Sequence, residues 1–350
     1  MNRFAPPPYL ANAHVQTIAN SMKTRRLLLL RRAGGMLRAS TPHILDCGEG
    51  VRLLGYHSPQ RKNPGPLCIL IHGWEGDAAS SYLLSAAGYL WNHGFSILRL
   101  NLRDHGPTHH LNRGLFHGCR LREVIGAVHY IQERFPFQRL FLAGFSLGGN
   151  FALRVGSHAR ESGLQMERIA AVCPVLHPEH AITALENGFP LYHWYFTKKW
   201  LQSLEKKHRL FPDTIDMEAL SRFRSIRSLT EYFVSRYMDF ANADEYLNAY
   251  ALLGDRLSGL EVPATIIASA DDPVIPHKDL ELLARPPAAL SIEKQSRGGH
   301  CGFIQDFLMT SWADERLREL FSEKAESRDH YREGEKKCLD GIKGLCISGS

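Results

Sequence analysis

A serine set between glycines is the first feature of the sequence that could do chemistry. Residues 144–149 read Gly-Phe-Ser-Leu-Gly-Gly, with Ser146 third. They begin within the apolar run 139–146 and lead into a stretch with helical spacing, 148–160. A nucleophile elbow has this setting, because a strained strand-to-helix turn exposes the serine and its neighbours two positions away must be small. The pattern predicts Ser146 as a nucleophile; the alternative is a glycine-rich turn with an idle serine.

Acidic residues that could belong to the same site follow further along the chain. The apolar run 264–270 is followed by Asp271 and Asp272, in a turn that Pro276 closes. A serine hydroxyl needs a base within hydrogen-bonding distance, and that base is oriented by a third group. We prefer Asp272 as this group because the acid in such turns usually stands four positions before the proline. Asp271 remains the alternative, and the other aspartate would then cap a helix.

The base itself is predicted in the loop after the last apolar run. His300 lies within Arg-Gly-Gly-His-Cys-Gly-Phe, where the glycines would let the ring reach both the serine and the aspartate. The order serine, acid, histidine is the order of the nucleophile-elbow enzymes. We therefore predict His300 as the general base; the alternative is a structural loop histidine.

The oxyanion of the reaction would need two backbone N–H donors. One normally comes from the residue after the nucleophile, which is Leu147. The second is expected from the loop after the run 67–73, where the sequence His-Gly-Trp-Glu-Gly makes Trp74 the candidate. The alternative for this loop is an ordinary turn at a strand end.

A histidine-rich stretch at 104–110 raises the question of a metal. His105 and His109 could share one face of a helix, but Pro107 makes a helix improbable there. A loop near the mouth of the pocket is the preferred interpretation, and we expect no metal and no cofactor. Cys301 stands beside His300 without an elbow around it, which indicates a packed thiol.

The elements that must position these residues alternate along the chain. Short apolar runs alternate with longer amphipathic stretches, which predicts an α/β fold with a mostly parallel central sheet flanked by helices. The expected strands are 67–73, 96–101, 139–146, 168–175, 264–270 and 289–295. The expected helices are 80–92, 121–134, 148–160, 277–284 and 305–321.

One interval, about 177–260, breaks this alternation. It has aromatic and basic helical segments and no convincing strand, which predicts a helical cap inserted into a single domain, 1–325. Residues 326–350 are expected to be a solvated tail. The aromatic part of the cap could line a channel for an acyl chain or could pack the cap onto the sheet. The predicted substrate-binding residues are Tyr192, Trp194 and Phe196.

Composition excludes some classes of protein. Lys and Arg number 42 against 36 Asp and Glu, and the excess is spread over the chain, so nucleic acid is not an expected partner. Weak peripheral contact with a membrane is the most that this charge supports. The seven scattered cysteines indicate reduced thiols in the cytoplasm, and the N-terminus shows neither a signal peptide nor a membrane anchor.

These motifs resemble the YheT-like branch of the α/β-hydrolases, which is similar to eukaryotic abhydrolase-domain lipases and yeast medium-chain ethanol acyltransferases. The likeness is carried by PPPYLANAHVQTI, HGWEG, GFSLGGN, ADDPVIP and GGHCGF, together with the segment that begins RFRSIRSLTEYF. It implies an ester hydrolase with Ser146, Asp272 and His300 as its triad. The family's Arg-Gly pair after the fourth strand is replaced here by 103–106, Arg-Asp-His-Gly.

The expected function is hydrolysis of short or medium-chain acyl esters or monoacylglycerols through an acyl-enzyme intermediate. The expected partner is therefore a small ester or lipid substrate. Three alternatives remain open: transfer of the acyl group to an alcohol, a binding protein on a hydrolase scaffold, and a metal-dependent hydrolase.

Overall fold

The fold is built on one sheet whose strands are joined mainly by helices. A computed structural model describes residues 3–60, 64–220, 222–283 and 286–323. The strands are β1 (Thr41–Asp46), β2 (Arg52–Ser58), β3 (Leu67–Ile71), β4 (Ser96–Asn101), β5 (Leu140–Phe145), β6 (Arg168–Val172), β7 (Ala264–Ser269) and β8 (Leu290–Gln295). Their order in the sheet is β1-β2-β4-β3-β5-β6-β7-β8.

All strands from β3 to β8 pair in parallel, whereas β1 and β2 are antiparallel additions at one edge. The six predicted strands are thus confirmed, and the two antiparallel ones were missed. From β3 the chain goes to β4 on one side of β3 and then returns to β5 on the other side. Such a reversal of direction leaves a crevice at the carboxyl ends of the two strands, where α/β proteins bind ligands.

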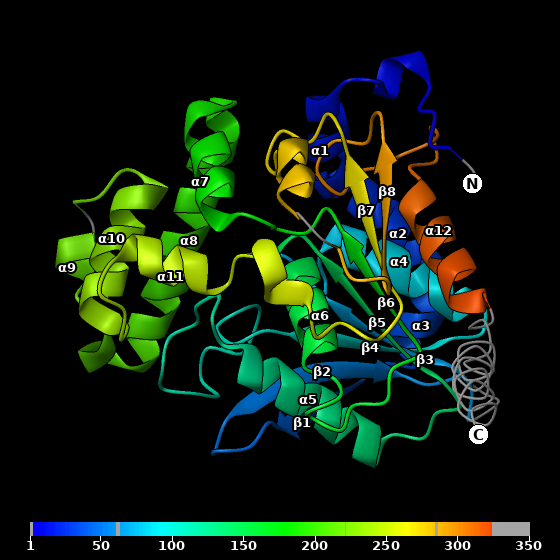
Figure 1. The fold of residues 1–350 in the computed structure, drawn as a ribbon, viewed down its shortest axis with the longest axis horizontal. Coiled ribbons are helices and arrows are strands. Elements are labelled where there is room, and N and C mark those ends of the chain that lie inside the picture. Colours follow the sequence, from blue (N-terminus) through cyan, green and yellow to red (C-terminus); the bar gives the residue numbers. More distant parts are fainter. Residues whose placement is uncertain (1–2, 61–63, 221, 284–285, 324–350) are drawn as a thin grey trace, which may run out of the picture.

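Helices cover both faces of this sheet (Figure 1). In β3, Leu67, Ile69 and Ile71 pack in one core with α5 (Leu121–Arg134) and α6 (Leu147–Ser157). Cys68 and Leu70 point to the other core, which contains α3 (Gly34–Arg38), α4 (Ser81–Asn92) and α12 (Trp312–Ser322). Because side chains alternate along a strand, a strand that is apolar at every position supplies both cores.

The N-terminal part of the chain also packs onto this layer. It forms a 3-10 turn, η1 (Pro8–Leu10), and the helices α1 (Ala13–Ser21) and α2 (Lys23–Arg32). Helix α2 and helix α1 both contact α4, so these two helices lie against the domain rather than apart from it.

Two expected helices differ in the structure. In the stretch predicted as helix 277–284 there is only a 3-10 turn, η4 (His277–Leu282). The residue before it, Pro276, has an extended backbone conformation. The expected helix 305–321 begins only at Trp312, because Ile304 and Ser311 pair in a bridge that closes a turn before it.

Between 177 and 260 the described residues form helices and 3-10 turns and no strand. They are α7 (Pro178–Asn187), α8 (Pro190–Leu210), η2 (Pro212–Thr214), α9 (Met217–Leu220), α10 (Ile226–Tyr237), α11 (Ala243–Ala249) and η3 (Gly254–Leu257). Most of these helices gather to one side of the sheet (Figure 1, left). None of the described helices is long and apolar enough to span a membrane. The expected tail, 326–350, lies outside the described residues.

A buried ion pair fastens α8 to the loop after β4. Lys207, 1% exposed, donates from Nζ to Asp104 Oδ1 at 2.8 Å and to the carbonyl oxygen of His109 at 3.2 Å. One turn earlier in the helix, Ser203 donates from Oγ to the carbonyl oxygen of Asp104 at 3.1 Å. The second half of α8 is therefore held to the sheet by charge and hydrogen bonds.

Candidate active site

Ser146 occupies a sharp turn between β5 and α6. Its φ of 55° and ψ of −120° are unfavourable for a residue with a side chain. A Cβ at Gly144 would lie 2.0 Å from the carbonyl oxygen of Gly148, and one at Gly148 would lie 2.4 Å from the carbonyl oxygen of Ile71. Both neighbours must therefore be glycine. The Ser146 N–H donates to the carbonyl oxygen of Val172 at 2.9 Å, which ties the turn to β6.

His300 and Asp272 meet at the carboxyl ends of β7 and β8. His300 Nδ1 and Asp272 Oδ2 lie 2.8 Å apart, and the Asp272 side chain is only 2% exposed. The other carboxylate oxygen, Oδ1, accepts the N–H groups of Val274 at 2.8 Å and Ile275 at 2.9 Å. These two amides fix the carboxylate, and the carboxylate in turn orients the imidazole.

Asp271 has different partners. Its Oδ1 accepts the N–H of Gly299 at 2.9 Å and the hydroxyl of Ser269. It thus joins the end of β7 to the loop that carries His300, while Asp272 contacts the ring itself.

Electrostatics favours a proton on the His300 ring. Burial lowers the pKa of His300, but the negative charge of Asp272 and the neighbouring Cys301 outweigh this effect. The pKa of His300 is therefore raised well above its ordinary value. The same negative charge would stabilise the imidazolium that forms when the ring takes a proton.

The first helix of the chain holds the His300 loop in place. Thr17 Oγ1 accepts the N–H of His300 at 2.9 Å, and Asn20 Nδ2 donates to the carbonyl oxygen of Cys301 at 2.8 Å. Gly299 has a φ of 56°, and a Cβ there would lie 2.4 Å from a carbonyl oxygen of α1. This support was missed at the sequence level, although its segment lies within the PPPYLANAHVQTI motif. The partners are more than 280 residues apart.

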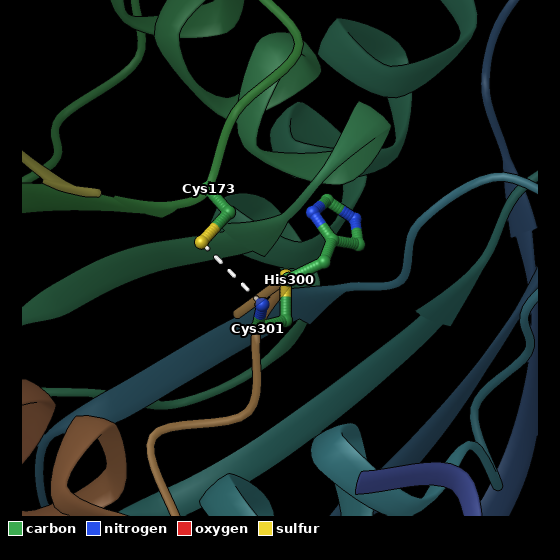
Figure 2. A group of neighbouring side chains, drawn as sticks. All are labelled: Cys173, His300 and Cys301. Atoms are coloured by element: carbon green, nitrogen blue, oxygen red, sulfur yellow. Dashed lines mark hydrogen bonds between the residues drawn. The ribbon is translucent and has the colours of Figure 1, made fainter. Parts of the chain in front are cut away.

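The serine turn and the histidine loop meet at the end of β6. The carbonyl oxygen of Val172 accepts both the Ser146 N–H at 2.9 Å and the Cys301 thiol at 3.7 Å. The N–H of Cys301 donates to Cys173 Sγ at 3.4 Å, drawn as the dashed line in Figure 2. One carbonyl group thus joins the turn that carries the serine to the loop that carries the histidine.

The two predicted oxyanion donors, Trp74 and Leu147, line the same cavity as Ser146. Leu147 is the first residue of α6, so its N–H has no partner within the helix. A Cβ at Gly73 would lie 3.0 Å from Ser146 Cβ, which shows how closely the loop of Trp74 approaches the serine. Gly73 is itself held by the Tyr82 hydroxyl, which accepts its N–H at 2.9 Å.

His72 fixes the start of this loop. Its Nε2 accepts the N–H of Leu102 at 3.1 Å, so Nδ1 carries the proton and donates to the carbonyl oxygen of Gly73 at 2.8 Å. Burial lowers the pKa of His72, which keeps the ring neutral. Its role is structural, in the backbone next to Trp74.

The cavity at Ser146 encloses about 840 Å³ of empty space, part of it open to solvent. Its wall is mainly apolar and comes from the loops after β3 and β4 and from helices of the 177–260 interval. The apolar lining includes Trp74, Phe116, Leu147, Val175, Ile182, Leu185, Phe196, Trp200, Ile226, Phe233, Met238 and Leu247. A site with this apolar lining suits an apolar ligand with one reactive polar group.

The three predicted substrate-binding residues lie in different places on α8. Phe196 lines the cavity and stacks on Trp74 with ring centroids 5.4 Å apart. Tyr192 is buried but hydrogen-bonds His14 at 2.9 Å, and Trp194 is 55% exposed; neither is among the described residues lining the cavity. The helical period explains Trp194, which lies two positions from Phe196 and so points to the opposite face. Tyr192 lies four positions from Phe196, on the same face of the helix but one turn earlier, where it contacts His14.

The histidine-rich stretch also spreads its side chains. His105 Nδ1 hydrogen-bonds the carbonyl oxygen of Arg103 at 2.6 Å, and its ring lies 4.9 Å from that of His72. His109 Nε2 instead meets Ser203 Oγ at 2.9 Å. The two rings therefore serve separate contacts, one within the loop and one with α8.

The sheet order and the serine turn at the end of β5 are those of the α/β-hydrolase fold. The family described as "alpha/beta hydrolase fold" matches residues 66–307, and the chain belongs to this family. The fold class and the family resemblance predicted from the sequence are thereby confirmed.

Several curated proteins are similar to this chain. Human phospholipase ABHD3 is 23% identical over 245 residues, covering 69% of this chain and 59% of that protein. In Saccharomyces cerevisiae, medium-chain fatty acid ethyl ester synthase/esterase 2 is 23% identical over 289 residues, covering 73% of this chain and 62% of that one. The yeast monoacylglycerol lipase is 23% identical over 301 residues, with 77% and 63% covered. The chain thus spans about three fifths of the length of these relatives.

Solved structures share the fold. Est1E from Butyrivibrio proteoclasticus, with bound ferulic acid, has a TM-score of 0.53 at 18% identity, covering 80% of this chain and all of that one. The 2,6-dihydroxy-pseudo-oxynicotine hydrolase has a TM-score of 0.56 at 15% identity, covering 90% and 76%.

Proposed function

We propose that this protein is a serine hydrolase of carboxylic esters, with Ser146 as nucleophile, His300 as general base and Asp272 as the acid that orients the base. The observation that carries this proposal is the strained serine turn at an apolar cavity, joined through Val172 to the loop whose histidine is paired with a buried aspartate.

The first half of the reaction forms an acyl-enzyme. Asp272 accepts a hydrogen bond from the Nδ1–H group of His300, which leaves Nε2 free to take the hydroxyl proton of Ser146. Ser146 Oγ then attacks the ester carbonyl carbon, and the carbonyl oxygen becomes an oxyanion. As the intermediate collapses, the alcohol leaves with the proton that His300 had taken. The acyl group remains bound to Ser146 Oγ as an ester, which is the acyl-enzyme.

The second half returns the enzyme to its starting state. A water molecule gives a proton to His300 and attacks the acyl-enzyme, and Ser146 regains that proton as the acid departs. In both halves the N–H groups of Leu147 and Trp74 stabilise the oxyanion. One such donor is typically worth about 10²- to 10³-fold in rate.

The substrate we propose is a short or medium-chain acyl ester, including monoacylglycerols. The acyl chain would lie against the apolar wall that Phe196, Trp200 and Phe233 contribute, with its carbonyl group at Ser146. The support is the apolar character of the wall, together with relatives named as a phospholipase, a monoacylglycerol lipase and an ethyl ester esterase.

Acyl transfer to an alcohol is the second candidate. One similar yeast protein is named as both an ethyl ester synthase and an esterase, which puts both acceptors within the chemistry of this fold. In this reaction an alcohol replaces water in the second half, and the residues keep their roles. Product analysis in the presence of ethanol or glycerol separates the two activities.

The test is hydrolysis of a p-nitrophenyl ester series from acetate to palmitate, with fluorophosphonate labelling, by wild type and Ser146→Ala. We expect wild type to hydrolyse esters and to label, and Ser146→Ala to do neither. Ser157→Ala, at the end of the same helix, is the matched control and should behave like wild type. A wild-type chain that neither labels nor hydrolyses any ester would refute the proposal.

A further inference from the structure

Two cysteines stand beside the proposed base. Cys173 follows β6, and Cys301 follows His300 in the loop after β8. One ligand atom of each of these three side chains lies within 4.8 Å of those of the other two. Figure 2 shows the three side chains gathered from these two segments. Both cysteines are buried, at 2% and 5% exposure, and neither is disulfide-bonded.

Two sulfur atoms and one imidazole nitrogen are the ligands that soft divalent cations prefer. In a tetrahedral zinc site the Zn–S and Zn–N bonds of about 2.3 and 2.0 Å separate two sulfur atoms by roughly 3.8 Å and a sulfur from a nitrogen by roughly 3.5 Å. The separations here, at most 4.8 Å, would have to shorten by about 1.3 Å at most when a cation binds.

The surroundings of the cluster also suit a cation. The carboxylate of Asp272 already bonds the His300 ring, and a carboxylate is one of the usual partners behind a histidine that binds metal. A second cavity, with about 240 Å³ of empty space, is lined by Cys173 and Asp272. This cavity brings empty space up to one sulfur atom of the cluster and to the carboxylate behind the histidine.

We propose that Cys173, His300 and Cys301 form an inhibitory binding site for a soft divalent cation such as Zn²⁺. On binding, the two thiols become thiolates and release their protons to solvent, and the cation takes one ring nitrogen of His300. The site differs in position and role from the metal considered for the histidine-rich stretch.

Inhibition follows from either nitrogen of the ring, and this consequence rests on the proposed function. Nδ1 is the atom that bonds Asp272. Nε2 is the atom that must take the proton of Ser146. A cation on either one removes a contact that the general base needs, so the bound enzyme cannot activate its nucleophile.

Binding is measured first, because this measurement does not depend on activity. The full-length chain, reduced and free of metal, is titrated with Cd²⁺, and the thiolate-to-metal absorption band is followed. We expect one Cd²⁺ per chain, displaced by Zn²⁺. Cys173→Ser and Cys301→Ser should each weaken binding by at least about tenfold. Cys47→Ser, at the opposite edge of the sheet, is the matched control and should bind like wild type.

Inhibition is measured second, on ester hydrolysis. Zn²⁺ should inhibit wild type, a chelator should restore its activity, and each of the two serine variants should need at least about tenfold more Zn²⁺, relative to its own uninhibited rate. The absence of a thiolate band would overturn the proposal, as would equal inhibition of wild type and both variants. A thiolate band in a protein without any esterase activity would support the cation site and would contradict the proposed hydrolase function.

Discussion

Replacing Asp272 by asparagine tests the geometry of the proposed triad most directly. The carboxylate has two distinct ends: Oδ1 accepts the N–H groups of Val274 and Ile275, and Oδ2 faces His300 Nδ1. In Asp272→Asn, one end becomes an NH₂ group. If that group faced the two amides, two buried donors would lose their acceptor, at about 1–3 kcal/mol each. The amide oxygen therefore stays with the amides, and the NH₂ group faces His300.

This orientation changes which nitrogen of the His300 ring carries the proton. Nδ1 must now accept a hydrogen bond, so the proton moves to Nε2, where the base has to be free. Enzymes with a serine triad lose about 10⁴-fold in kcat from this change, which corresponds to roughly 5.5 kcal/mol in the activation barrier. We expect a loss of that order with little change in KM, because neither Asp272 nor His300 is among the described residues lining the main cavity.

Asp271→Asn is the matched control. Its Oδ1 accepts the N–H of Gly299 and the hydroxyl of Ser269, and an amide oxygen can accept both. We expect this variant to stay within about tenfold of wild type, the equivalent of roughly 1.4 kcal/mol. The assay is p-nitrophenyl butyrate hydrolysis, with circular dichroism to verify folding. If a folded Asp272→Asn kept more than a tenth of the activity, or if Asp271→Asn lost more than Asp272→Asn, the assignment of the acid would be wrong.

Three further predictions concern the cavity, the histidine loop and the core. Ala181→Trp would fill part of the cavity and raise KM for longer esters by about tenfold, because roughly two methylene groups of the acyl chain would no longer be buried. The KM for the acetate ester should change less. Asn187→Trp, at an exposed position of the same helix, is the control and should leave the KM of both esters unchanged. Thr17→Val removes the acceptor of the His300 N–H, worth about 1 kcal/mol, and should lower kcat about fivefold at constant KM; Thr17→Ser should restore kcat, and a failure to do so would argue against a positioning role. Burial raises the pKa of Asp314 to about 7 despite its hydrogen bond from Ser85, so its ionisation in the folded state opposes folding. The protonated carboxyl therefore contributes fully to the free energy of unfolding below about pH 4, and this contribution is lost as the pH rises through 7, at about 1.4 kcal/mol per pH unit or roughly 4 kcal/mol in all. In urea unfolding, Asp314→Asn should lack this part of the pH dependence. Parallel curves of unfolding free energy against pH for the two proteins would refute the assignment.

Short motifs carried most of what the sequence predicted about the site. Ser146 and His300 each lie in a glycine-rich segment a few residues long, and Asp272 lies in a turn directly after a buried strand. Such segments can be recognised from a few successive residues, before it is known which distant parts of the chain support them. The six parallel strands were predictable for a similar reason, because strands buried on both faces are apolar at successive positions.

Features that depend on packing between distant segments were not predictable. β1 and β2 lie at the edge of the sheet, where polar residues interrupt the apolar pattern. The contact of Thr17 with His300 joins residues 283 positions apart. Phe196 and Trp194 are both aromatic and nearly adjacent, yet only the rotation of α8 against the sheet decides which of them faces the cavity.

The buried ion pair between Lys207 and Asp104 determines how the cavity can open. Moving the second half of α8 outward would separate two buried charges, a change that typically costs about 3–5 kcal/mol. The first half of the helix carries Phe196 over the cavity and has exposed aromatic side chains such as Trp194 and no comparable buried charge. Any outward swing of α8 must therefore pivot on its Lys207 end. The end of the helix near Pro190 is held to α1 by the hydrogen bond between Tyr192 and His14, which costs less to break than a buried ion pair.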